Sequence, residues 1–186
     1  MNKNNIVIIH GTYGNPNINW FPWLKKELNL LNQNVIVPKF PTPENQTIEK
    51  WIEILDKNVK EYDDSLILIG HSSAPLVICA KLQQLKKPIK ASFFIAPFLG
   101  TIGNEVYDKA NNNFVSYPFN WQKIKQMSKF FIYRSDNDPY VPVKFGKIIA
   151  DNLKVKETTI HNGKHLNGEA GFDSFPKLLE DIKKIL

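Results

Sequence analysis

Short, continuous apolar runs alternate along this chain with segments in which apolar residues recur every three or four positions. Runs of this kind predict strands buried on both faces, and they cover residues 6–10, 35–38, 66–70, 91–96, 130–134 and 155–161. The three-and-four spacing predicts amphipathic helices, with apolar stripes over 48–62, 145–153 and 175–186. This alternation is typical of an α/β fold with a mostly parallel sheet.

The alternation runs through all 186 residues without a repeat, a linker or a low-complexity segment. We therefore expect one domain over residues 1–186, with about six strands and helices on both faces of the sheet. The least regular stretch is 97–118, which contains three consecutive asparagines. It follows a strand end and should overhang the carboxyl edge of the sheet, where ligands bind in such folds. It is either a rudimentary cap or a plain surface loop.

One predicted strand ends in the turn Gly70-His71-Ser72-Ser73-Ala74, which leads directly into an apolar helical pattern. This G-x-S-x-A sequence is a variant of the nucleophile elbow, in which a sharp turn holds a serine hydroxyl above the sheet. The residues two before and two after the serine must be small because strand and helix crowd them. Ser72 is therefore the predicted nucleophile, and a simple βα turn with a serine cap is the alternative.

A serine hydroxyl needs a neighbouring base, and the base needs an orienting acid. In this kind of fold the chain order is serine, acid, histidine. Asp138 follows a strand end in the sequence D-P-x-V-P and is the predicted acid, with Asp136 as its competitor. His161 and His165 lie beyond the acid, and we assign the base to His165 because its glycine-containing loop can bring the ring to Ser72.

Two backbone N–H groups should bind the oxyanion. The first is Ser73 N–H, directly after the nucleophile and at a helix N-terminus. The second should come from the loop after the first strand, from Thr12 or Tyr13. Tyr13, Trp20 and His71 are predicted to line the substrate pocket.

Composition excludes several other functions. The net charge of +6 comes from scattered lysines with a single arginine, Arg134, whereas nucleic-acid binding favours clustered arginine. No apolar run approaches a membrane span or a signal-peptide core. The single cysteine, Cys79, fits a reducing compartment, so we expect a cytoplasmic protein. No phosphate loop, dinucleotide fingerprint or H-E-x-x-H metal motif occurs, and we predict neither cofactor nor metal.

Several stretches resemble the small serine hydrolases of the retinoblastoma-binding protein 9 type, within the α/β-hydrolase superfamily. They are the first strand with its glycine turn and residues 23–28, 40–43, 69–73, 121–125 and 138–139. The resemblance implies a compact α/β-hydrolase fold with a minimal lid, and it carries the family's triad onto Ser72, Asp138 and His165. The L-x-C-x-E motif for retinoblastoma-protein binding has no counterpart around Cys79, so that partner is not carried over.

The sequence therefore predicts a serine hydrolase that cleaves small carboxylic esters, with amides as a further substrate class, through an acyl-enzyme. The competing hypothesis is a catalytically silent module that binds a small molecule or a protein on the same fold.

Overall fold

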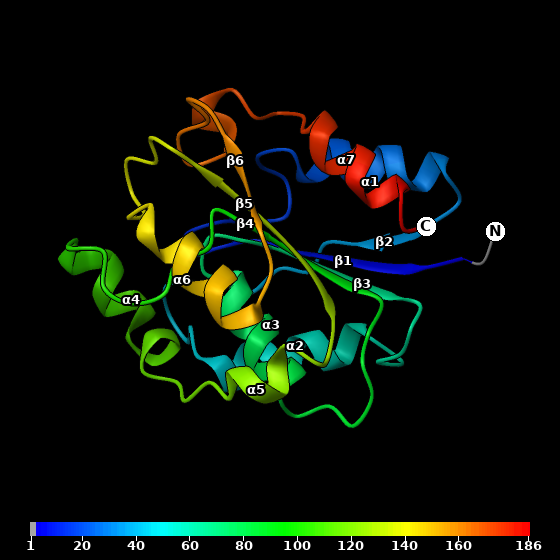
Figure 1. The fold of residues 1–186 in the computed structure, drawn as a ribbon, viewed down its shortest axis with the longest axis horizontal. Coiled ribbons are helices and arrows are strands. Elements are labelled where there is room, and N and C mark those ends of the chain that lie inside the picture. Colours follow the sequence, from blue (N-terminus) through cyan, green and yellow to red (C-terminus); the bar gives the residue numbers. More distant parts are fainter. Residues whose placement is uncertain (1–2) are drawn as a thin grey trace.

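A single parallel sheet organises the molecule, and the computed structural model describes residues 3–186 of it. Residues 1 and 2 of the predicted domain lie outside this range. The strand order is β2-β1-β3-β4-β5-β6, with every neighbouring pair parallel (Figure 1). The strands are β1 (Asn5–Ile9), β2 (Asn34–Ile36), β3 (Leu66–His71), β4 (Ala91–Ile95), β5 (Lys129–Ser135) and β6 (Glu157–Ile160). The chain thus builds outward from β1 in both directions.

Helices cover both faces of this sheet (Figure 1). One face carries α1 (Phe21–Leu30) and α7 (Pro176–Lys183), and the other carries α2 (Ile48–Asn58), α3 (Ala74–Leu82), α5 (Trp121–Ile124) and α6 (Lys144–Leu153). Each face buries its own apolar cluster against the sheet. The predicted fold class, an α/β fold with six parallel strands and two helical layers, is confirmed.

Burial explains which strands the sequence predicts well. All residues of β3 and β4 are buried because each has strands on both sides and helices on both faces, and their continuous apolar runs reflect this. The edge strands β2 and β6 are shorter than predicted, with three and four residues. An edge strand pairs on one side only, so an apolar run can extend beyond its last ladder hydrogen bond.

Residues 97–118 contain an eleven-residue helix, α4 (Glu105–Val115), so the alternative of a plain surface loop is wrong. Asn104 caps this helix by accepting the Tyr107 N–H through its side chain. Asp108 accepts the N–H groups of Ile102 and Gly103, which secures the chain entering the helix. Local capping therefore stabilises a helix whose polar sequence gives little hydrophobic signal.

Throughout residues 3–186, every helix is too short or too polar to span a bilayer.

Candidate active site

The sheet order reverses at β1, which lies between β2 and β3. The carboxyl ends of β1 and β3 therefore flank the crevice at which ligands bind in open α/β sheets. Gly11 follows β1 and Ser72 follows β3, and a side chain on Gly11 would lie 2.7 Å from Ser72 Cβ and 3.0 Å from the His71 carbonyl. This position requires glycine because the two loops touch.

Ser72 occupies the tip of the elbow in a strained backbone conformation, with φ of 59°. Its N–H donates to the Ile95 carbonyl at 2.9 Å, which ties the turn to the neighbouring strand. A Cβ on Gly70 would lie 3.0 Å from the backbone nitrogen of Pro75, so only glycine fits between strand and helix. A serine at positive φ costs on the order of 1–3 kcal/mol and is usually found at functional sites.

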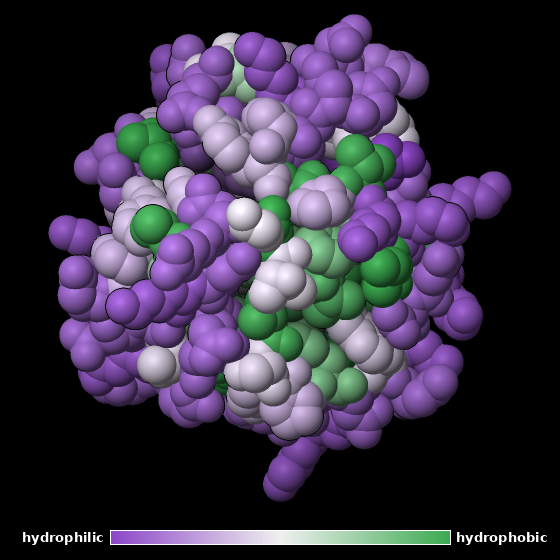
Figure 2. Space-filling model, turned by 90° about the vertical axis from the view of Figure 1, so that its left-hand side faces the viewer, coloured by the Kyte–Doolittle hydropathy of each residue, from purple (hydrophilic) through white to green (hydrophobic). Residues whose placement is uncertain are grey.

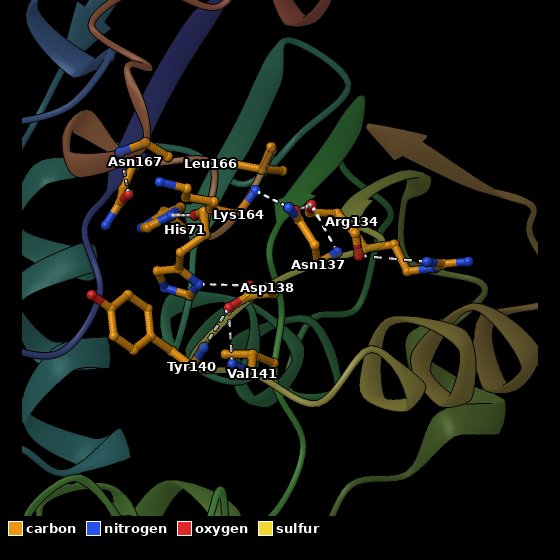
Figure 3. A network of polar contacts seen from close by, with 12 residues as sticks. His71, Arg134, Asn137, Asp138, Tyr140, Val141, Lys164, Leu166 and Asn167 are labelled. Carbon is orange, nitrogen blue, oxygen red and sulfur yellow. Dashed lines mark hydrogen bonds and ion pairs between the residues drawn. The ribbon is translucent and has the colours of Figure 1, made fainter. Parts of the chain in front are cut away.

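His165 and Asp138 form a buried pair beside the elbow. The ring nitrogen Nδ1 of His165 lies 2.8 Å from Asp138 Oδ2, and the two side chains are only 10% and 5% exposed. The other oxygen of Asp138 accepts the N–H groups of Tyr140 and Val141, each at 2.9 Å (Figure 3). These hydrogen bonds fix the carboxylate, which in turn fixes the imidazole.

The competing carboxylate, Asp136, binds the other downstream histidine. Its Oδ2 lies 2.6 Å from Nδ1 of His161, and its Oδ1 accepts the Asn162 N–H at 2.8 Å. His161 is 82% exposed, so this pair lies on the surface and secures the turn after β6. Burial therefore separates the two Asp–His pairs, and only the pair of Asp138 faces the elbow.

Ser72 and His165 line the same cavity. Because Nδ1 of His165 faces Asp138, Nε2 is the ring nitrogen left for the serine. Within the described part of the chain, no hydrogen bond joins Ser72 Oγ to His165. Hydrogen bonds of this kind are often loose without a substrate and tighten in its complex.

His71 supports the His165 loop from beneath. Its ring is buried beside the aromatic rings of Trp20 and Phe21, with the residue 4% exposed, and Nε2 donates to the His165 carbonyl at 3.0 Å. Burial lowers the pKa of His71 to about 3. The imidazole is therefore neutral at pH 7 and serves as a fixed hydrogen-bond donor.

Of the predicted pocket residues, Tyr13 and His71 line the cavity. The prediction for Trp20 is wrong, because its side chain is fully buried in the core beneath His71. Its indole N–H donates to the Leu166 carbonyl at 3.0 Å. Trp20 thus holds the loop that carries His165 and does not face the cavity.

The three backbone N–H groups predicted as oxyanion donors differ in the acceptors they bind in this structure. Thr12 N–H donates to Ser73 Oγ at 2.9 Å, and Tyr13 N–H donates to Thr42 Oγ1 at 2.7 Å. Among residues 3–186, Ser73 N–H has no acceptor. Ser73 is the N-cap residue of α3, so its N–H hydrogen and the positive end of the helix dipole are available to an anion.

The cavity in front of Ser72 measures about 540 Å³, enough for a small organic molecule. Apolar walls come from Phe21, Phe98, Ile102 and Val141, and tyrosines 13, 107 and 140 lie around them. Figure 2 views the side that carries α4 and shows hydrophobic and intermediate residues gathered at the centre of a hydrophilic rim. In residues 3–186 no group of three His, Cys, Asp or Glu side chains is arranged to hold a metal ion.

Sequence reasoning missed a set of polar residues behind the elbow. Gln46 and Asn111 are almost fully buried and hydrogen-bond to Thr12. Neither lies in a recognisable motif, and the asparagine run looks like a surface segment in the sequence. Only their burial in the folded protein shows that they belong to the site.

Fold, elbow and buried Asp–His pair together define an α/β hydrolase. In agreement, residues 6–184 match the family described as serine hydrolase, and the chain belongs to that family. This match does not test the resemblance to the retinoblastoma-binding protein 9 type, which remains a prediction.

Individual relatives fit this assignment. The chain is 26% identical over 175 residues to "Putative hydrolase YdeN" of Bacillus subtilis, covering 92% of this chain and 90% of that protein. The crystal structure of the B. subtilis ydeN gene product superimposes with a TM-score of 0.90 at 24% identity, covering 98% of each chain. Est1E of Butyrivibrio proteoclasticus shares the fold with a TM-score of 0.72 at 18% identity, covering 98% of this chain and 86% of the other.

Proposed function

We propose that the protein hydrolyses small carboxylic esters, with amides as a further substrate class, through a Ser72–His165–Asp138 triad. The observation that carries the proposal is the buried His165–Asp138 pair, whose histidine lines the same cavity as a serine held at positive φ. Among the described residues that line this cavity, Ser72 is the one serine and there is no cysteine.

The reaction follows from the roles of these atoms. His165 Nε2 accepts the Ser72 hydroxyl proton while Oγ attacks the ester carbonyl and forms a tetrahedral oxyanion. The protonated imidazole then gives this proton to the leaving alkoxide, and an alcohol departs from the acyl-enzyme. A water molecule, deprotonated by the same imidazole, attacks the acyl carbonyl. The imidazolium then returns the proton to the departing Ser72 Oγ as the bond to the acyl carbon breaks, which releases the acid and the free serine. Asp138 keeps the imidazole in the required tautomer and stabilises its protonated form.

Oxyanion stabilisation begins with Ser73 N–H, which has a free hydrogen at the start of α3. Thr12 N–H, the second candidate, is held by Ser73 Oγ at 2.9 Å. It serves the oxyanion only by exchanging this acceptor for the developing charge. Since a negative oxygen is the stronger acceptor, the exchange is favoured in the transition state.

The walls of the cavity favour uncharged acyl groups. Apolar and aromatic side chains share the lining with neutral polar ones, and the two carboxylates that line it are Glu169 and Asp173. The described residues that line it include no lysine or arginine. A carboxylate in the acyl chain would be repelled, so neutral short or aromatic acyl esters are the expected substrates.

The test is an assay of p-nitrophenyl esters of increasing chain length, with Ser72→Ala as the matched control. We expect turnover by the native protein, none above background by the variant, and slower turnover of a succinyl than a butyryl ester. Equal rates for native protein and variant would reject the catalytic role. A native protein that turns over no ester, yet is stabilised by small ligands, would favour the binding-module alternative.

A further inference from the structure

A chain of buried and half-buried polar side chains ties the loop after β1 to three other segments. Its members come from that loop, the segment before α2, the elbow and α4, and they are Thr12, Thr42, Gln46, Ser73 and Asn111. Ser73, Gln46 and Asn111 are 1%, 5% and 4% exposed. Buried amides are costly unless their hydrogen bonds are made, so this network is a defined structural unit.

Counting protons fixes the direction of the bonds around Thr12. Asn111 Oδ1 can only accept, and it lies 2.6 Å from the Thr12 hydroxyl and 2.9 Å from Gln46 Nε2. The Thr12 proton is thereby used. The Ser73 hydroxyl, 2.9 Å from Thr12 Oγ1, must then donate to it, and Gln46 Nε2 donates to the same oxygen at 2.9 Å.

The network also ends on the backbone of the same loop. Thr12 N–H donates to Ser73 Oγ, and Tyr13 N–H donates to Thr42 Oγ1. The Thr42 hydroxyl in turn donates to Gln46 Oε1 at 2.6 Å. Two successive N–H groups, both candidates for the second oxyanion donor, are therefore held by side chains of this unit.

Asn111 brings α4 into the arrangement. Its Nδ2 donates to the Tyr107 carbonyl one turn earlier at 2.9 Å, which fixes the amide orientation and leaves Oδ1 directed at Thr12. Tyr107 and Asn111 also line the substrate cavity. The helix that forms a wall of the cavity is thus hydrogen-bonded to the loop that faces the nucleophile.

We propose that Gln46 and Asn111 are positioning residues that fix the Thr12–Tyr13 backbone opposite Ser72 and couple it to α4. Their effect on catalysis rests on the proposed function. Neither residue touches the reacting atoms; each acts through the Thr12 hydroxyl. A misplacement of about 1 Å in such a group can lower a rate by about 10²-fold, so loss of the network should reduce kcat and leave KM nearly unchanged.

The decisive variant is Asn111→Leu, which keeps the branched side-chain shape and removes the hydrogen bonds. Asn112→Leu is its matched control, because Asn112 is the exposed neighbour on the same helix. We expect Asn111→Leu to lower kcat for a p-nitrophenyl ester by roughly 10- to 100-fold with KM within about threefold. Asn112→Leu should match the native protein.

Substitution at Thr12 tests the same network from its other end and guards against a misfolded Asn111 variant. Thr12→Val removes the hydroxyl at constant shape and should lower kcat as Asn111→Leu does. Thr12→Ser restores the hydroxyl and should recover kcat to within about threefold of native. A merely structural role predicts no such rescue.

Amide hydrogen exchange provides a readout that does not depend on turnover. The backbone amides at positions 12 and 13 should exchange at least about tenfold faster in Asn111→Leu and Thr12→Val than in native protein or Asn112→Leu. Unchanged exchange in both variants would overturn the inference, as would unchanged kcat. Absence of esterase activity in the native protein would instead refute the proposed function, while the exchange rates would still decide whether the network fixes the loop.

Discussion

Acid should destabilise this protein through His71, whose neutral imidazole is buried beneath the site. Burial lowers its pKa from 6.5 in the unfolded chain to about 3 in the folded protein. Below pH 6.5 the unfolded chain therefore binds a proton that the folded state does not, so stability falls as pH falls. The fall starts near pH 6.5 and levels off near pH 3. Between pH 7.5 and pH 5 this residue should cost about 2 kcal/mol.

The assay is urea unfolding at pH 7.5 and pH 5 of the native protein and His71→Gln. Glutamine carries no charge at either pH and can still donate to the His165 carbonyl. The variant should lose about 2 kcal/mol less than native on acidification, equivalent to a melting-temperature difference of about 4–8 °C for a chain of this size. His161→Gln changes a histidine whose side chain is 82% exposed and is the control. It should lose as much stability between pH 7.5 and pH 5 as the native protein. An equal loss in native protein and His71→Gln would refute the role of His71.

Substitution or modification at three further positions should change activity, stability or reactivity. Asp138→Asn should lower kcat by about 10⁴-fold because it reverses the imidazole tautomer, while Asp136→Asn on the surface pair should leave steady-state kinetics unchanged. Gly11→Ala places a Cβ 2.7 Å from Ser72 Cβ; overpacking of this kind costs about 1–3 kcal/mol, and both the melting temperature and phosphonate labelling should fall. Cys79 is buried and its pKa is raised by burial, so iodoacetamide should modify it only in unfolded protein, as a mass shift shows.

The central part of the fold is predictable because its strands are buried on both faces. In β3 and β4 nearly every position is apolar or small, and short runs of this kind between turn residues are typical of interior strands. The helix α4 is different: its sequence is polar, and it forms because Asn104 caps it and Asp108 secures the entering chain. Capping of this kind leaves only a weak trace in the sequence.

The pairing of acids with histidines could be predicted only in part. Chain order limited the acid to Asp136 or Asp138, and D-P-x-V-P favoured Asp138, which the structure joins to His165. The prediction that Trp20 lines the pocket was wrong because an aromatic residue near a glycine loop fits a pocket wall as well as a core position. Its full burial is a tertiary property, set by helices from both ends of the chain packing on one face.

Activation of Ser72 by His165 is the central claim, and active-site labelling tests it most directly. A fluorophosphonate probe should attach one equivalent to native protein at Ser72, identified by peptide mass spectrometry. His165→Gln should react at least about 10²-fold more slowly, and Ser72→Ala should not react. Equal labelling of the native protein and Ser72→Ala, or a full rate in His165→Gln, would contradict the claim.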